Sequence, residues 1–385
     1  MPLKVSKRGF IPPFIVMDVM EAAAEREASS KAVFHLELGQ PGTSAPQGVL
    51  AAAKQAIDNN RLGYTLSGGI PELRTAIAGH YNSSYNVTID PSRVFVTTGS
   101  SGSFVLSFLS SFDVGDRVAM AAPGYPCYRN ILSAFGVESV LILTEAEHRY
   151  QPTPDLLEKL IREQGPIDGL IIASPSNPTG TIIDAAGMVE LCSYCSNNGI
   201  RLISDEIYHG ITYDSQAVSA LEFDNNAVTI NSFSKYFSMT GWRLGWMVVP
   251  EDLIRPVECL AQNLFISAPT LSQIAGVAAF DCYAELEENV AKYATNRSLL
   301  LEQLPKAGFN RLAPADGAFY IYADVSELTN DSNELCRRIL TETGVAITPG
   351  LDFDPDRGNR FVRFSFAASH EEVAGAANAL VDWSS

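Results

Sequence analysis

The feature that most constrains the fold of this chain is an alternation of short apolar runs with helical patterns between about residues 47 and 250. Strand-length apolar runs recur at 94–97, 117–121, 139–143, 169–173, 201–204, 227–231 and 244–249. Helical patterns lie between several of them, as at 102–112 and 185–198. This alternation predicts an α/β domain with a mostly parallel sheet. Ligands of such sheets bind at the carboxyl ends of the strands, so we expect the chemistry in the residues that follow these runs.

The pattern changes after Pro269. A long helical stretch at 271–304, short strands near 318–323 and 360–366, and a closing helix near 371–383 predict a second, smaller α+β domain. The N-terminal segment before the alternating region contains several prolines and is followed by a helical pattern at 16–29. We therefore expect residues 1–46 to form an N-terminal arm that contributes to the small domain. Residues 47–284 would form a large ligand-binding domain and residues 285–385 a small C-terminal domain.

The composition and the net charge of the chain disfavour some classes of binding partner. Hydrophobic residues make up 46% of the 385 and charged residues 18%, which is typical of a chain that folds around a large core. The 27 basic and 44 acidic residues give a net charge of −17, which disfavours nucleic acid and anionic membrane surfaces as partners. No apolar run reaches the ~20 residues of a membrane-spanning helix. Six cysteines are too few for a disulfide framework, so we expect a cytoplasmic protein.

Two of the predicted strands end in unusual residues. Residues 174–180, Ser-Pro-Ser-Asn-Pro-Thr-Gly, follow one run, and their prolines and glycine exclude a helix. Such a loop can hold the side chain of Asn177 in a fixed direction, although a plain turn explains the same residues. Asp205 ends another run, with Tyr208 three residues further on. A buried carboxylate there requires a positive partner, whereas a helix cap also explains Asp205.

A third strand end carries a lysine in an unusual setting. Lys235 follows the run at 227–231 and lies between two aromatic residues and two serines, in a stretch without a carboxylate. Partial desolvation would lower the pKa of its amine and make it nucleophilic, although a surface lysine with a buried stem also fits. The hydroxyls at 232, 234, 238 and 240, together with Arg243, could bind a phosphate.

One cofactor accounts for all three strand ends. Pyridoxal phosphate needs an amine to bond to its aldehyde, an acid to keep its ring nitrogen protonated, donors for its phenolic oxygen and a cup for its phosphate. The residues that meet these needs are, in that order, Lys235, Asp205, the pair Asn177 and Tyr208, and the group Ser232, Ser234 and Arg243. A second phosphate-binding element is the turn at 97–102, in which Gly99, Ser100 and Ser101 open a predicted helix.

These residues also carry a family resemblance. The chain resembles the class I/II aminotransferases, pyridoxal-phosphate enzymes of fold type I, over nearly its whole length. The match is specific in three motifs, namely S-x-N-P-T-G within 174–180, S-D-E-x-Y at 204–208, and S-x-S-K followed by G-W-R-x-G at 232–245. The resemblance implies a large domain that binds the cofactor on a mostly parallel seven-stranded sheet sandwiched by helices, plus the smaller α+β domain.

The resemblance implies further roles. Tyr125 would stack on the cofactor ring, and Tyr64 would reach the phosphate of the neighbouring subunit, which implies a homodimer with active sites at the subunit interface. Arg363 would pair with the substrate α-carboxylate, because a planar guanidinium binds a carboxylate bidentately. Gly39 and Asn177 would complete the substrate site. From its position alone, an arginine within a predicted strand is expected at the edge of a sheet.

The implied activity is a ping-pong transfer of an amino group between an L-amino acid and a 2-oxo acid through a Schiff base on Lys235. The amine of Lys235 would move the proton of the substrate Cα, with Asp205 and Tyr208 completing the catalytic set. A C–S lyase of the same fold, similar to cystathionine β-lyase, would share these residues and stays an alternative. A second arginine for a dicarboxylate substrate would come from the partner subunit. The sequence alone does not place it, and the candidates are Arg26, Arg61, Arg129, Arg255 and Arg297.

Two other classes of protein lack support in the sequence. Glu206 and His209 are spaced as in di-iron helices, and Cys192 and Cys195 form a C-x-x-C pair, but neither pattern has the second pair that a metal site requires. We therefore expect no metal. A non-enzymatic regulator on this fold would carry an added DNA-binding domain, for which the N-terminal arm is too short.

Overall fold

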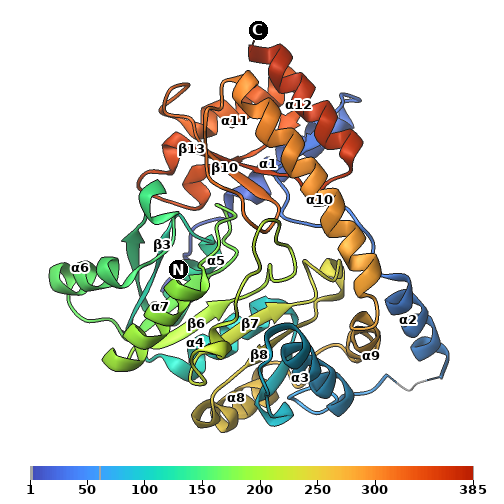
Figure 1. Cartoon of the computed structure of the whole chain (residues 1–385), viewed down its shortest axis with the longest axis vertical. Helices are drawn as coiled ribbons and strands as arrows, with labels where there is room; N and C mark the ends of the chain where they lie inside the picture. The colour runs from blue at the N-terminus through green and yellow to red at the C-terminus, as the bar shows by residue number, and fades with distance from the viewer. Residues whose placement is uncertain (1–2, 60–61, 385) are drawn as a thin grey trace.

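A twisted sheet of seven strands lies at the centre of the computed structural model, which describes residues 3–59 and 62–384 (Figure 1). In spatial order the strands are β2 (Val94–Thr97), β8 (Gly245–Val248), β7 (Val228–Ser232), β6 (Arg201–Asp205), β5 (Gly169–Ala173), β3 (Arg117–Ala122) and β4 (Glu138–Leu143). The strands run parallel except for β8, which is antiparallel to both β2 and β7. The predicted mostly parallel sheet of seven strands is confirmed.

Helices cover both faces of this sheet. They are α2 (Gln47–Asn59), α3 (Pro71–Tyr85), α4 (Gly99–Ser111), α5 (Pro126–Phe135), α6 (Pro154–Gln164), α7 (Ala185–Asn198), α8 (Glu251–Leu264) and α9 (Thr270–Ala279). Met120 and Ile171 pack with α4, α5 and α8 on one face, whereas the adjacent Ala119 and Leu170 pack with α6 and α7 on the other. Because alternate side chains enter two buried faces, each strand reads as a continuous apolar run.

A second region contains an antiparallel sheet, in the order β12 (Thr348–Pro349), β13 (Phe361–Ser365), β10 (Tyr320–Asp324) and β9 (Arg311–Leu312). Its helices are α1 (Ile15–Ala28), α10 (Tyr283–Gln303), α11 (Ser332–Thr343) and α12 (His370–Ser384). The N-terminal segment enters this region because β1 (Phe34–His35) pairs in parallel with β11 (Val345–Ala346). The predicted division into domains at 46/47 and 284/285 stays a prediction.

The predicted helix at 271–304 is wrong in one respect, because the structure has two helices there, α9 and α10. The amide N–H groups of Asp281 and Cys282 bond to carbonyl groups three residues back, at 3.2 and 3.1 Å, and so end the regular helical ladder. The break contains neither proline nor glycine, so no helix-breaking residue marks it in the sequence. Figure 1 shows α10 running from the large sheet up to the smaller one. No helix in the described ranges is both long enough and apolar enough to cross a bilayer.

The strand β1 is held by charged side chains. The amide N–H of His35 donates to Glu372 at 2.9 Å. The ring of His35 contacts the buried carboxylate of Glu37 through Nδ1 at 2.8 Å and Glu27 of α1 through Nε2 at 3.2 Å. The hydrogen bond to Glu37 raises the pKa of His35 to about 9, although partial burial opposes this shift. A charged His35 therefore ties α1 to the strand that follows it.

This arrangement predicts a dependence of stability on pH. The pKa of His35 is higher in the folded protein than its ordinary 6.5, so its stabilising effect is complete below pH 6.5 and is lost as the pH rises through about 9. We expect the free energy of unfolding to fall across this range, and His35→Gln to flatten the fall. Denaturant unfolding at several pH values measures both proteins, and an equal fall in the two would contradict the prediction.

Candidate active site

The carboxyl ends of β5, β6 and β7 open into one cavity with a volume of about 630 Å³. Eleven of the predicted site residues line this cavity, namely Gly39, Ser100, Ser101, Tyr125, Asn177, Asp205, Tyr208, Ser234, Lys235, Arg243 and Arg363. The smaller sheet closes one side through β10 and β13, and α1 contributes a further wall. Residues that are far apart in the sequence therefore meet in one space between the two sheets.

Lys235 lies on the loop that follows β7, with its amine inside the cavity. The amine donates a hydrogen bond to the carbonyl oxygen of Gly39 and lies 5.8 Å from the ring centroid of Tyr208. Burial lowers the pKa of Lys235 to about 8, and repulsion by Arg363 and Arg243 acts in the same direction. The amine is therefore a base and nucleophile close to neutral pH.

Asp205 is the last residue of β6 and is buried. Its carboxylate accepts hydrogen bonds from the hydroxyl of Tyr128 and from the amide N–H of Ile207, the latter at 3.0 Å. Burial raises the pKa of Asp205 to about 6, whereas both hydrogen bonds and the charge of Lys235 oppose the rise. The residues after Asp205 form turns, so the helix-cap interpretation is excluded and the carboxylate faces the cavity.

Arg363 lies in the central strand β13, between β10 and β12, and is 3% exposed. Its guanidinium donates to the side-chain oxygen of Asn177 at 2.9 Å and to the carbonyl of Glu37 at 2.5 Å. The expectation that an arginine in a strand marks a sheet edge is therefore wrong here. Among the described residues, Nε of Arg363 has no hydrogen-bond partner. A buried guanidinium with a free donor is suited to a carboxylate.

Two tyrosines of the site were missed by sequence reasoning. Tyr128, which bonds to Asp205, follows Tyr125 by three residues at the start of α5, a spacing that places both rings on one side of the helix. Tyr320 of β10 bonds to Tyr208 through their hydroxyls at 2.6 Å, and its ring centroid lies 4.3 Å from the guanidinium of Arg363. Helical spacing could have predicted the position of Tyr128, whereas the position of Tyr320 depends on how the two sheets meet.

The opposite end of the cavity is built for an anion. Gly99 begins α4 with a φ of +66°, and a Cβ atom there would lie 2.4 Å from Nη2 of Arg243. The residue before the helix, Thr98, makes no capping hydrogen bond with its side chain. The uncapped first turn of α4 therefore lies beside Arg243 with no side chain between them, and a helix N-terminus next to an arginine is suited to binding phosphate.

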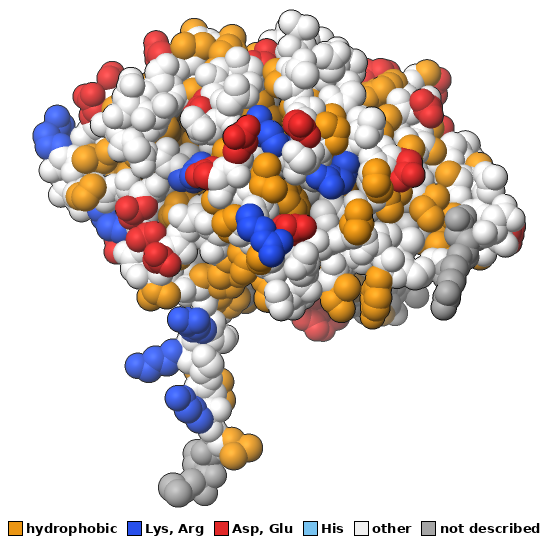
Figure 2. Space-filling model, turned by 90° about the horizontal axis from the view of Figure 1, so that it is seen from below, with side chains coloured by type: hydrophobic (Ala, Val, Ile, Leu, Met, Phe, Trp, Pro, Cys, Tyr) orange, Lys and Arg blue, Asp and Glu red, His pale blue; other side chains and the backbone are white. Residues whose placement is uncertain are grey.

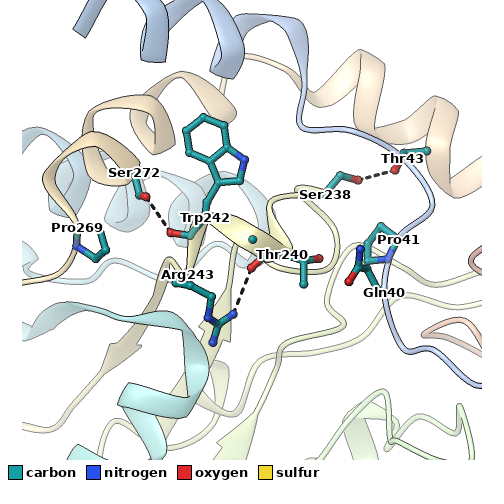
Figure 3. A pocket seen from close by; sticks show the side chains of 10 residues that line it. Gln40, Pro41, Thr43, Ser238, Thr240, Trp242, Arg243, Pro269 and Ser272 are labelled. Carbon is teal, nitrogen blue, oxygen red and sulfur yellow. Dashed lines mark hydrogen bonds between the residues drawn. The ribbon is translucent and has the colours of Figure 1, made fainter. Parts of the chain in front are cut away.

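Arg243 also lines an adjoining hollow of about 570 Å³, shown in Figure 3. Its Nη1 donates to the carbonyl of Thr240 at 3.2 Å, and the hydroxyl of Ser238 bonds to that of Thr43 at 2.7 Å. Both Ser238 and Arg243 have left-handed backbone conformations, with φ values of +54° and +51°. Such conformations are unfavourable for these residue types and occur where a loop is held in shape for function.

Three predicted residues do not line the main cavity. Gly99 lies beside the guanidinium of Arg243. Ser232 is fully buried, and its hydroxyl contacts the hydroxyl of Ser234 at 2.9 Å and the carbonyl of Leu244 at 3.0 Å. Tyr64 is 85% exposed and lines a separate surface hollow beside Thr98. Within a single chain, Tyr64 is therefore apart from the other site residues.

The residues considered for a metal site have other roles. Glu206 is buried and accepts a hydrogen bond from Ser219, and His209 bonds through Nδ1 to the hydroxyl of Tyr85 at 2.7 Å. The two cysteines of the C-x-x-C pair are buried in the apolar cluster under α7. Each of these side chains is explained by packing or by hydrogen bonds within the protein.

Comparisons with known proteins agree with this geometry. The chain matches the family described as aminotransferase class I and II over residues 31–380. It is 51% identical to valine–pyruvate aminotransferase of Mycobacterium tuberculosis, over 99% of this chain and 98% of that protein. The crystal structure of an aminotransferase from Mycobacterium tuberculosis superposes with a TM-score of 0.97 at 50% identity, covering 99% of both chains. Aspartate aminotransferase from Thermus thermophilus with maleate gives 0.93 at 28% identity, covering 99% of this chain and 100% of that one.

The chain therefore belongs to the class I and II aminotransferase family. It is an aminotransferase, which decides between the two activities that the motifs left open. The family uses pyridoxal phosphate, and the residues present fit this cofactor. The lysine amine and the space that only a glycine at position 99 leaves beside Arg243 match the aldehyde and the phosphate of the cofactor, and the unpartnered Nε of Arg363 is left for a carboxylate of the substrate.

The lowered pKa of Lys235 can be tested in the apoenzyme. Only the neutral amine attacks an aldehyde, so we expect covalent uptake of pyridoxal phosphate to accelerate with pH and to reach half of its limiting rate near pH 8. Stopped-flow absorbance measures this rate, with N-acetyl-lysine amide as the reference amine and Lys235→Ala as the control that forms no covalent bond. A midpoint near the ordinary value of 10.5 would show that burial does not activate the amine.

Proposed function

We propose that this enzyme transfers the amino group of L-valine, or of a similar aliphatic L-amino acid, to pyruvate in the cytoplasm. The observation that carries the reaction type is the meeting of Lys235, Asp205 and Arg363 in one cavity. The choice of substrates rests on the relative that is 51% identical over nearly the full length of both chains and is named valine–pyruvate aminotransferase. The reaction would be ping-pong, with the oxo acid of the donor leaving before pyruvate binds.

Pyridoxal phosphate, when bound, supplies an aldehyde that amines can join and a ring that accepts the electron pair released at the substrate Cα. In this proposal Asp205 would hold the proton of the ring nitrogen, Asn177 and Tyr208 would donate to the phenolic oxygen, and Tyr125 would contact the ring. Gly99, Ser100, Ser101, Ser234 and Arg243 would hold the phosphate, with Ser232 orienting Ser234.

The protein's own side chains would then position the substrate and move one proton. Arg363 binds the α-carboxylate through its paired N–H groups and is itself held by Asn177 and by the carbonyl of Glu37. Fixing the carboxylate orients the Cα hydrogen toward the amine of Lys235. That amine, with a pKa of about 8, would take the proton from Cα as a general base and would return it as a general acid.

The reaction is tested with valine and pyruvate as the substrate pair. We expect the holoenzyme to produce alanine and 3-methyl-2-oxobutanoate, measured by chromatography. Lys235→Ala should lower turnover by roughly 10³-fold or more, because no amine is then present to transfer the Cα proton of the substrate. Non-covalent binding of the cofactor should persist. Lys292→Ala is a matched control, since that lysine lies on α10 outside the cavity lining and bonds to Asn289 of the same helix.

Two results would contradict this function. Near-normal turnover in Lys235→Ala would remove the lysine from the mechanism. Exchange of amino groups with other donors and acceptors, but not between valine and pyruvate, would contradict the proposed substrates.

We also propose that two chains assemble into a homodimer with shared active sites. Tyr64 is 85% exposed, and the nearby apolar side chains of Leu66 and Ile266 are 63% and 51% exposed. Figure 2 shows the N-terminal segment projecting from the body, where Leu3 and Phe10 are 94% and 74% exposed. Apolar surface of this kind is expected to be covered by a partner. In such a dimer the hydroxyl of Tyr64 would reach the phosphate of the other subunit.

Tyr64→Phe should then weaken cofactor retention without dissociating the dimer. A hydrogen bond to a charged group contributes about 1.5–3 kcal/mol, so we expect the dissociation constant for pyridoxal phosphate to rise roughly 10- to 100-fold. Spectroscopic titration measures it, and Tyr194→Phe on α7 is the control. Sedimentation velocity gives the oligomeric state, and a stable, active monomer would contradict the shared site.

A further inference from the structure

We propose that Tyr320 is a positioning residue that joins the substrate site to the cofactor site, because its hydroxyl orients Tyr208 while its ring orients Arg363. This inference rests on the proposed function, in which Tyr208 donates to the phenolic oxygen of the cofactor and Arg363 binds the substrate α-carboxylate. It assigns a role to a residue that lies outside the three sequence motifs.

The hydroxyl of Tyr320 has one bonding direction that fits the proposed reaction. It forms a hydrogen bond with the hydroxyl of Tyr208 at 2.6 Å. A tyrosine hydroxyl has a single proton to donate. When Tyr208 donates its proton to the phenolic oxygen, the proton between the two tyrosines has to come from Tyr320. Tyr320 then donates to Tyr208 and Tyr208 to the cofactor, and hydrogen bonds in such a chain strengthen one another.

The ring of Tyr320 lies against the guanidinium of Arg363, with 4.3 Å between the ring centroid and Cζ. A guanidinium stacked on an aromatic ring has a fixed plane, which favours bidentate binding of a carboxylate. The contact also acts on the tyrosine. Burial raises the pKa of Tyr320, and the charge of Arg363 opposes this rise. A phenol beside a cation is a stronger donor, which agrees with the direction of the bond to Tyr208.

A third contact of Tyr320 is with a residue that has no side chain. A Cβ atom at position 39 would overlap the hydroxyl oxygen of Tyr320, and Cζ of the ring would lie 3.2 Å from it. The carbonyl of Gly39 accepts the hydrogen bond from the amine of Lys235. The glycine therefore lets the hydroxyl of Tyr320 lie directly against the backbone that faces the reactive amine.

Within one chain, the orientation of the α-carboxylate depends on Arg363. The other arginine that lines the cavity, among the described residues, is Arg243 at the phosphate end. The arginines considered for a second carboxylate are, with one exception, outside this lining, and they are Arg26, Arg129, Arg255 and Arg297. The exception, Arg61, lies outside the described residues. Tyr208 and Tyr320 are 3% and 1% exposed, so their contacts do not require a partner subunit.

The near-visible absorbance of the holoenzyme, titrated with pH, tests the hydroxyl. A donor on the phenolic oxygen competes with the proton that the bound cofactor shares with the nitrogen of Lys235, so weaker donation keeps that proton bound to higher pH. Tyr208→Phe removes the donor and sets the full rise of the titration midpoint. Tyr320→Phe should produce a part of this rise, roughly 0.4–1 pH unit.

Tyr322→Phe is the matched control, because it removes another buried hydroxyl from β10 outside the cavity lining. It should leave the midpoint unchanged. An unchanged midpoint in Tyr320→Phe, beside a raised one in Tyr208→Phe, would overturn the inference. An unchanged midpoint in Tyr208→Phe would also overturn it, because Tyr320 would then have no donor to orient.

Binding of an unreactive carboxylate tests the ring. Calorimetry with 3-methylbutanoate is performed on the loaded enzymes at a pH below all of their midpoints. Tyr320→Leu should raise the dissociation constant roughly 3- to 10-fold, since the ring of Phe353 still lies 4.8 Å from Cζ of Arg363. Tyr320→Phe keeps the ring and should bind within about twofold of the wild type. Equal affinity of Tyr320→Leu and the wild type would overturn the inference.

These readouts are separate from the proposed reaction because neither requires turnover. Absence of exchange between valine and pyruvate would refute the proposed substrates, whatever the midpoints show. An unshifted midpoint in Tyr320→Phe would overturn the role of Tyr320 even if that exchange is confirmed.

Discussion

When helices cover both faces of a sheet, its polar reactive side chains can lie only at the ends of the strands. The seven-stranded sheet here is buried on both sides, so side chains such as Met120 and Ala119 are committed to packing. Asp205 and Lys235 escape this constraint because they end or follow a strand. The smaller sheet then closes over the same edge and brings Arg363, which gives the cavity its positive charge.

That positive charge contrasts with the rest of the molecule. The chain carries a net charge of −17, yet three cations and one carboxylate line the cavity. Burial, together with repulsion by Arg363 and Arg243, lowers the pKa of Lys235 to about 8, and the cations make the cavity attractive to anions. The field of these cations therefore adds to the effect of burial on the lysine and recruits the phosphate and carboxylate groups on which the proposed reaction depends.

The parts of the site that follow from local sequence were predictable, and the parts that depend on tertiary contacts were not. The strands and the three motif loops are specified by neighbouring residues, so Asn177, Asp205 and Lys235 could be placed in advance. The central position of Arg363, its stacking on Tyr320 and the break after α9 depend on contacts between distant segments. The periodicity of apolar residues in the sequence carries no information about such contacts. The hydrogen bond from the amide N–H of Val16 in α1 to Asp352, 336 residues away, is the clearest example.

The placement of α1 has a consequence for how enzymes of this fold diversify. An aspartate aminotransferase shares the architecture with a TM-score of 0.93 at 28% identity, so the fold does not by itself fix the substrate. Here Val16, Met17 and Met20 of that N-terminal helix line the cavity, and the motifs at the strand ends begin some eighty residues later. Substitutions in the helix therefore change one wall of the cavity while the residues at the strand ends stay as they are.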